Sequence, residues 1–344
     1  MADAVAAGMA WCQIWDIAAV RLETVHWLLP RRRCGCCRKT TTASVPFGQA
    51  GAVTYGLNVN AAAVLLGSAG HVPVERTAML MEALLGTRVS TGFVARAHER
   101  LAEALAAAGF DEAMRDALAA EPVLCGDETP VNVARKDTDE QGQPVPGSPH
   151  VVCLRTPEAR LVWYRALPAR TKQALRTLGL FSPAMEQGLE QARDPQLDLP
   201  DPGPGGWFTG SLVRDDYAAW HQFDPHLAGV QQCIAHVFRH CQAVLDTHPT
   251  QQAWAGQVRD VLREAHAAVQ AAQANGVDHL DPTLLTDLRD RYTEAISWGQ
   301  TTNRHRDWPK GNHPGYNLAH RLATKTDQVW LFTKDFAVPW TNNA

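Results

Sequence analysis

The sequence has no excess of positive charge, few cysteines and no long apolar run. Its 344 residues include 32 Lys and Arg against 36 Asp and Glu, for a formal net charge of −4. Without an overall positive field, any contact with nucleic acid has to come from local basic patches. The longest apolar stretch, residues 53–69, is interrupted by Asn58, Asn60 and Ser68, so it is too short and too polar to span a bilayer. We therefore expect a soluble protein with no membrane partner.

The N-terminal segment and the cysteines argue against a secreted disulfide scaffold. Residues 1–10 have no basic stretch ahead of an apolar one, which argues against a secretory signal and makes the cytoplasm the expected compartment. Eight unevenly placed cysteines do not form a disulfide framework over this length. Cys34 and Cys37 make one C-x-x-C pair, which supplies half of the ligands of a closed zinc site. Reduced thiols in a small basic segment are the other interpretation.

Shifts in composition divide the chain into three regions. Residues 1–45 are short and basic and cannot hold a large core. Residues 46–120 show the apolar and amphipathic patterns that predict helices. From residue 121 the pattern changes to strands and then to helices, so we expect 121–344 to be an α/β region.

The third region begins with strands that carry acidic residues. Residues 122–133 are typical of a buried strand that delivers Asp127. Residues 150–165 predict a β-hairpin, a short helix follows, and a further strand over 207–213 runs into Asp215. The other expected elements are a Pro/Gly/Asp-rich connection over 194–206, helices at about 232–246, 252–274, 283–298 and 316–326, and hence a helical insertion at about 240–328.

Asp127 and Asp215 are candidate metal ligands because of the order of the elements around them. In a ribonuclease-H-like sheet the first and fourth strands are neighbours, so acids on these two strands would meet. Two carboxylates held close together repel unless a divalent cation neutralises them, and hard oxygen ligands favour Mg²⁺ or Mn²⁺. Such ions can activate a water or a 3′-hydroxyl for phosphoryl transfer. The alternative is that both aspartates only cap turns after strands.

Two further groups of residues could hold a ligand. Cys233, His236 and His240 fall on one face of a predicted helix, a geometry that suits zinc but equally suits packing against the sheet. A basic stretch near the C-terminus contains Arg304, Arg306, Lys310, Arg321 and Lys325. Such a stretch can bind phosphates, although a solvated helix edge is the commoner meaning of a charge run.

Taken together, these segments resemble the large transposase of the insertion sequence sixty-six family, a D-D-E enzyme of bacterial mobile elements. The matching segments are Arg33–Cys37, Val53–Leu57, Gly126–Pro130, Asp215–Trp220, Cys233–His236 and Trp340–Asn343. The resemblance implies a ribonuclease-H-like core with a helical insertion over 121–344. It also implies that the helical region 46–120 can bind DNA and that residues 1–45 hold part of a zinc-binding segment.

The resemblance implies site residues, cofactors and partners as well. Asp127 and Asp215 would be the first two catalytic acids and would bind Mg²⁺ or Mn²⁺, with Asp216, which stands where the family has Gly, as the fallback. Cys233 and His236 match a Cys-x-x-His element whose usual role is structural. The implied partners are DNA, as element ends and as target, and further copies of the chain in a homo-oligomer.

Two departures from the family pattern change what we expect of this chain. The family's third acid, a Glu, follows the pair Asn342–Asn343 within a few residues, and the sequence has none there. The first C-x-x-C of the zinc region is absent as well. We therefore expect a truncated and inactive copy of a transposase. The alternatives are a non-catalytic DNA-binding protein and a metal-dependent nuclease on the same fold.

Overall fold

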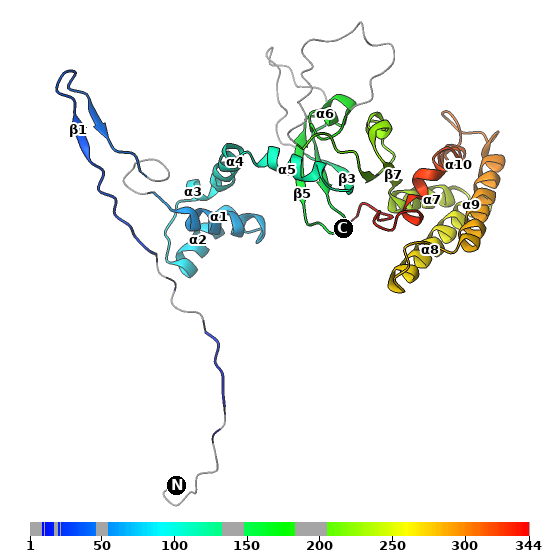
Figure 1. Cartoon of the computed structure of the whole chain (residues 1–344), viewed down its shortest axis with the longest axis horizontal. Coiled ribbons are helices and arrows are strands. Elements are labelled where there is room, and N and C mark those ends of the chain that lie inside the picture. The colour runs from blue at the N-terminus through cyan, green and yellow to red at the C-terminus, as the bar shows by residue number, and fades with distance from the viewer. Residues whose placement is uncertain are drawn as a thin grey trace, which may run out of the picture. The chain divides into compact units, whose positions relative to one another are not determined.

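The computed structural model describes residues 9, 11–16, 20, 22–45, 54–132, 148–182 and 205–343. The chain divides into two compact units, Met1–Phe110 and Asp111–Ala344, which are described separately (Figure 1). The connection expected over 194–206 lies outside the described residues except for its last two positions. Within the described ranges, no helix is both long and apolar enough to cross a membrane.

The first unit consists of a short hairpin and a cluster of helices. Strands β1 (Arg31–Arg33) and β2 (Thr40–Thr42) pair antiparallel and are exposed. The helices are α1 (Leu57–Ser68), α2 (Val74–Leu85), α3 (Thr91–Ala95) and α4 (Ala97–Ala107). They pack around a small core that includes Met81 and Val94. The helical pattern predicted for this part of the chain is confirmed.

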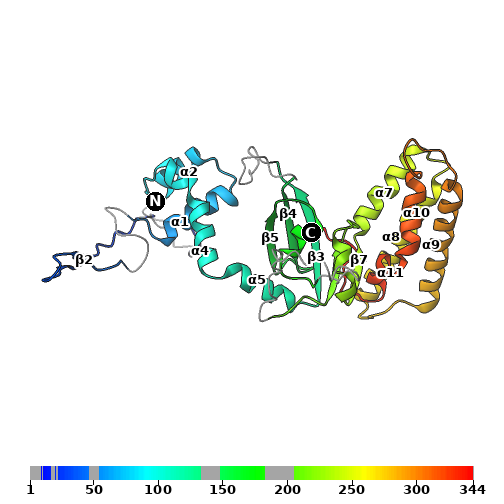
Figure 2. The same ribbon diagram turned by 90° about the horizontal axis from the view of Figure 1, so that it is seen from above.

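The second unit is built on a five-stranded mixed sheet. Its strands are β3 (Val123–Pro130), β4 (His150–Arg155), β5 (Val162–Leu167), β6 (Ser211–Arg214) and β7 (Gly229–Gln232). They lie in the order β5-β4-β3-β6-β7 (Figure 2). The pairs β3–β4 and β4–β5 are antiparallel, whereas β3, β6 and β7 run parallel. The carboxyl ends of these three parallel strands therefore share one edge of the sheet.

The two faces of the sheet are covered by different parts of the chain. Helices α5 (Phe110–Ala119) and α6 (Lys172–Arg176) share a buried core with Leu124 of β3. On the other face, Cys125 of β3 packs with Val338 from the C-terminal segment. Since side chains alternate along a strand, odd-numbered residues of β3 face the C-terminal segment and even-numbered ones face the α5–α6 side.

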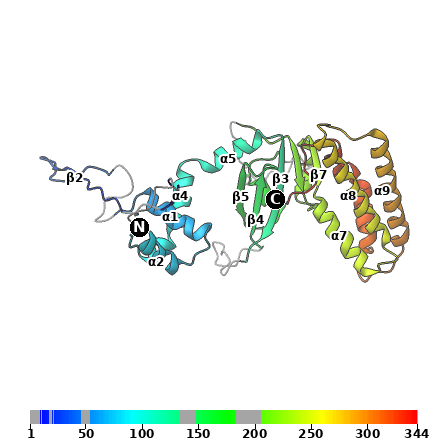
Figure 3. The same cartoon turned by 90° about the horizontal axis from the view of Figure 1, so that it is seen from below.

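A helical bundle follows the last strand. Its members are α7 (Ile234–Thr247), α8 (Ala253–Ala274), α9 (Pro282–Asn303), α10 (Pro314–Thr324) and the short α11 (Thr326–Val329). Figures 2 and 3 show them gathered beyond β7. Their common core includes the fully buried Trp254, Tyr292 and Trp330. The helices predicted for this part of the chain are present, and the first of them begins at Ile234.

Local sequence explains where the long helix α9 begins. The Asp281 carboxylate accepts hydrogen bonds from the amides of Thr283 and Leu284, two groups that have no partner inside the helix. Pro282 takes the first helical position, where its missing N–H costs nothing. The apolar face of α9 then packs against α8.

Two glycines in this bundle should respond oppositely to alanine. A Cβ at Gly299 of α9 would lie 2.5 Å from the ring of buried Trp254, whereas a Cβ at Gly256 of α8 meets nothing within 4 Å. We expect G299A to lower the free energy of unfolding by about 1–3 kcal/mol through overpacking. G256A should leave it unchanged or raise it by up to about 1 kcal/mol, because Ala favours helix. Urea denaturation of both variants measures the difference, and equal effects would contradict this packing.

Candidate active site

The pairing of β3 with β6 brings the segments that carry the two candidate acids next to each other. Cys125 pairs with Val213, and each candidate acid lies two residues beyond that pair. Asp127 is still within β3, whereas Asp215 directly follows the last residue of β6, Arg214. The prediction that the first acid lies on a strand adjoining the fourth strand is confirmed. Their joint binding of a metal ion stays a prediction.

Arg170 connects Asp215 to a second, buried carboxylate, Glu128. Its Nε donates to Glu128 Oε1 at 2.7 Å and its terminal nitrogen donates to Asp215 Oδ2 at 2.8 Å. The Glu128 side chain is only 1% exposed and also accepts hydrogen bonds from Trp220 Nε1. Burial raises the pKa of Glu128, and the negative charge of Asp215 raises it further, against the opposing effect of Arg170 and Trp220. Arg170 is therefore the counter-ion that lets Glu128 stay buried.

Tyr217 fixes both Asp215 and Arg170. Its backbone amide donates to Asp215 Oδ1 at 2.9 Å, and the Arg170 guanidinium lies 3.7 Å from the centre of its ring. The Tyr217 hydroxyl donates to the backbone carbonyl of Arg170. The Asp-x-Tyr-x-x-Trp spacing pointed to Asp215 without assigning these contacts, and Glu128 and Arg170 were missed at the level of sequence. The spacing itself was the available signal, since it holds Tyr217 and Trp220 beside Asp215.

Asp216, the fallback for the second acid, is fully engaged elsewhere. Its carboxylate contacts Lys325 Nζ at 2.5 Å, His221 Nε2 at 2.9 Å and Gln232 Nε2 at 3.2 Å, and Arg321 Nε lies 3.5 Å away. Burial alone would raise the pKa of Asp216, but the hydrogen bonds from His221 and Lys325 and the nearby cations outweigh it and hold that pKa far below its usual range. Because Asp216 is bound by these groups, Asp215 is the better candidate for the partner of Asp127.

Cys233 and His236 contact each other at the start of α7, and among the described residues neither belongs to a group of three possible metal ligands. Cys233 lies between β7 and α7, is buried, and its Sγ is 3.3 Å from Thr341 Oγ1. Burial would raise the pKa of the Cys233 thiol, but the hydrogen bond from His236 and those from Thr341 and Asn342 lower it overall. The same bond to Cys233 is the main cause that raises the pKa of His236. These contacts attach the C-terminal segment to the start of α7.

The C-terminal segment is also bound to β3 next to Asp127. Asn342 Nδ2 donates to the carbonyl of Gly126 at 2.8 Å, and Arg155 donates to the Asn342 carbonyl at 2.9 Å. The Ile234 amide donates to the Trp340 carbonyl at 2.9 Å. Asn342 is thus held against the strand that carries the first acid, and Trp340 against the start of α7.

The basic stretch divides into two parts in the structure. Arg304 follows the end of α9 and is exposed, as is Lys310, while Arg306 is partly buried and donates to the Gln251 side chain. Arg321 and Lys325 lie instead at the end of α10 and face Asp216. These five residues therefore do not form one continuous basic face.

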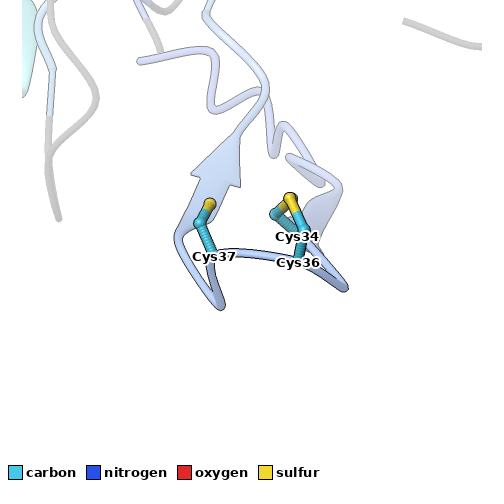
Figure 4. A group of neighbouring side chains, drawn as sticks. All are labelled: Cys34, Cys36 and Cys37. Atoms are coloured by element: carbon cyan, nitrogen blue, oxygen red, sulfur yellow. The ribbon is translucent and has the colours of Figure 1, made fainter.

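The first unit carries a separate cluster of thiols in the turn between β1 and β2. Cys34, Cys36 and Cys37 are exposed, and their sulfur atoms all lie within 4.8 Å of one another (Figure 4). The hydrogen bond between the Cys34 and Cys36 sulfur atoms, 3.0 Å long, is the main cause that lowers the pKa of the Cys34 thiol to about 6. This cluster could bind zinc. The C-x-x-C spacing paired Cys34 with Cys37 and left Cys36 out.

Comparison with known proteins adds one match. A model of the transposase IS66 family matches residues 53–344, which include the whole sheet, the helical bundle, Asp127 and Asp215. No curated protein sequence gives a significant match.

Replacing Arg170 by Gln should destabilise the second unit, because Glu128 then stays buried without its counter-ion. We expect R170Q to lower the free energy of unfolding by about 2–4 kcal/mol at pH 7. The pKa of Glu128 is raised in the folded protein. Between the ordinary pKa of a carboxyl group and this raised pKa, the folded state therefore binds more protons than the unfolded state. The free energy of unfolding falls as the pH rises through this range. The loss in R170Q should therefore be smaller at about pH 4.5 than at pH 7.

Arg291 supplies the matched control for this measurement. It also contacts two carboxylates, Glu264 and Asp287, but all three side chains are between 43% and 60% exposed. R291Q should cost less than about 1 kcal/mol. Equal losses for R170Q and R291Q in urea denaturation, or a loss in R170Q that is the same at both pH values, would contradict the role of Arg170 as counter-ion of Glu128.

Proposed function

Because the chain belongs to the transposase IS66 family, we propose that its second unit is the part that cuts and joins DNA, at a metal site formed by Asp127 and Asp215. The family inferred from the sequence motifs is thereby confirmed, and membership implies a transposase role and binding to DNA. The observation that supports the proposed site is the pairing of Cys125 with Val213 in β3 and β6, since each aspartate lies two residues beyond this pair.

We propose a ribonuclease-H-like fold for the second unit. Counted along the chain from β3, the strands lie in the order third, second, first, fourth, fifth. Only the second strand, β4, runs against the other four. The neighbouring first and fourth strands agree with the expectation from the sequence, and they support this proposal.

The residues at the end of β3 and β6 suit a divalent cation with oxygen ligands. Asp127 and Asp215 offer carboxylate oxygens, which Mg²⁺ and Mn²⁺ prefer. Asn342 Oδ1 is buried without a hydrogen-bond partner among the described residues, while its Nδ2 is bound to Gly126, the residue before Asp127. A divalent ion held here would act as a Lewis acid for phosphoryl transfer. Tyr217 and Arg170 orient the Asp215 carboxylate for this role.

The described residues provide two acids of a D-D-E site and not a third. In the described part of the chain, no group of three His, Cys, Asp or Glu side chains that includes Asp127 or Asp215 lies close enough to share an ion. Glu128 is buried and neutralised by Arg170. Two-metal catalysis loses both charge and geometry when one ligand is missing. We therefore propose that residues 1–344 by themselves carry out strand transfer weakly if at all.

We propose DNA as the substrate and a second copy of the chain as the partner in an active complex. The DNA would be the ends of a mobile element and a target site, bound by the helices of the first unit and by exposed cations such as Arg304 and Lys310. With a net charge of −4, the protein should bind DNA weakly and with strong dependence on salt. The bacterial cytoplasm is the proposed compartment, because the DNA is there.

Cleavage and joining of DNA with Mn²⁺ test the site. We expect weak nicking of a plasmid that carries the DNA flanking the gene, and we expect D127N and D215N to remove both this nicking and Mn²⁺ binding measured by calorimetry. D327N is the control, because it removes the same charge from an exposed ion pair with Lys334. Nicking that persists unchanged in D127N and D215N would exclude this site.

The same assay separates the alternative functions. Robust strand transfer that D127A abolishes would show that residues 1–344 supply the third ligand themselves. Cleavage without joining would indicate a nuclease. DNA affinity that is unchanged in D127N and D215N, with no metal-dependent activity, would indicate a non-catalytic DNA-binding protein.

We propose that Cys34, Cys36 and Cys37 supply three thiolates to a zinc ion. Cobalt(II) titration should give thiolate-to-metal absorption that is lost in C34S and kept in C12S, because Cys12 is exposed and outside the cluster. Since only the thiolate binds metal and the pKa of Cys34 is about 6, cobalt binding should weaken as the pH falls below that value. Absorption that is unchanged in C34S would exclude this site.

A further inference from the structure

The end of helix α10 brings two cations against Asp216, beside the proposed catalytic acid. Lys325 Nζ lies 2.5 Å from Asp216 Oδ1, and Arg321 Nε lies 3.5 Å from Asp216 Oδ2. His221 Nε2 lies 2.9 Å from both Asp216 Oδ1 and Lys325 Nζ. Because Asp216 directly follows Asp215, this cluster of Asp216, His221, Arg321 and Lys325 adjoins the carboxyl edge of the parallel strands, where ligands of open α/β sheets bind.

The two cations have more hydrogen-bond donors than Asp216 can use. An ammonium carries three N–H donors and a guanidinium five, whereas one carboxylate presents two oxygens. The side chains of Lys325 and Arg321 are 22% and 24% exposed, and that of Asp216 is 11% exposed. Part of each side chain is therefore accessible to solvent, although Arg321 Nε is buried and a terminal nitrogen of Arg321 contacts His240 Nδ1 at 2.9 Å.

A backbone phosphate of DNA presents the same chemistry as the carboxylate that the cations already bind. Its two non-bridging oxygens carry one negative charge at a spacing that Arg and Lys recognise in the same way as a carboxylate. The substrate proposed above therefore supplies a ligand that competes with Asp216 for the same donors. In the structure, the carboxylate of Asp216 is the anion that contacts both cations.

We propose that Arg321 and Lys325 form a phosphate site for the DNA backbone and that Asp216 occupies this site until DNA displaces it. The proposal rests on DNA as the substrate, which family membership implies, and not on metal binding at Asp127 and Asp215. Asp216 then weakens DNA binding in two ways: the cations must release it, and its own charge repels the incoming phosphate. The alternative is that Asp216 only attaches α10 to the sheet, through Lys325 on one side and Gln232 on the other.

Removing the charge of Asp216 should strengthen DNA binding. D216N keeps the size and one acceptor oxygen of the side chain but no longer holds two cations by charge. Each additional phosphate that the protein neutralises steepens the slope of log affinity against log salt concentration by about 0.9. At 0.1 M salt, relative to 1 M, this corresponds to about eightfold in affinity. Fluorescence anisotropy with a labelled 30-base-pair duplex in EDTA should show D216N binding about three- to tenfold tighter, with a steeper salt dependence.

Two further variants exclude a general charge effect. D327N removes the same charge from a carboxylate that binds Lys334 at 3.0 Å and is 83% exposed, so it should change affinity much less than D216N. K325Q combined with D216N should cancel most of the increase in affinity, because the freed ammonium is gone. A D216N protein that is folded and binds DNA no tighter than the original, or an equally large increase in D327N, would overturn the proposal.

Lysine acetylation of the unmodified protein provides a second measurement that does not depend on D216N folding. Bound DNA should slow acetylation of Lys325 several-fold, read by mass spectrometry, relative to Lys334. Equal reactivity of Lys325 with and without saturating DNA would overturn the proposal. Because both measurements are made in EDTA, they stay informative if the metal site at Asp127 and Asp215 fails its own test.

Discussion

The parallel pairing of β3 with β6 joins two strands that are far apart in sequence over only three residue pairs. It is held by burial on both faces, since Leu124 and Leu212 on one side and Val213 on the other are fully buried. A slip of one residue would move these apolar side chains to the wrong face of the sheet and would change the position of Asp215 relative to Asp127. The position of the proposed site therefore depends on the same burial that stabilises the sheet.

Arg170 adds rigidity where the sheet ends. Among the described residues of the second unit, its guanidinium is the group that contacts both Glu128 and Asp215, and it lies on the ring of Tyr217. A cation in contact with a proposed metal ligand neutralises part of the repulsion between neighbouring carboxylates before any ion binds. The same contact limits the orientations open to Asp215. Charge balance and positioning at this edge are thus supplied by one side chain.

Sequence alone predicted the elements with a strong periodic signal. The strand around Asp127 and the helices of the bundle were found because burial of one face leaves a period in the sequence. Arg170 gave no such signal, because it lies in the short connection before α6 and its partners are set by tertiary packing. The basic stretch was treated as one cluster in the sequence, but the chain turns between α9 and α10, so Arg304 and Lys325 belong to different helix ends. The pattern of charges in a sequence does not show which carboxylates the fold places beside each cation.

The proposed DNA contact at this edge depends on local charge, because the net charge of the protein is −4. Arg170 contacts Asp215, and Arg321 and Lys325 contact Asp216, so part of the negative charge of the carboxylates at this edge is neutralised locally. Burial strengthens these ion pairs, since a charge removed from water needs a partner. A cation in such a pair can exchange its carboxylate for another anion of similar geometry, because either anion neutralises its charge. An edge built this way can stay compact without DNA and offer its cations when a phosphate arrives.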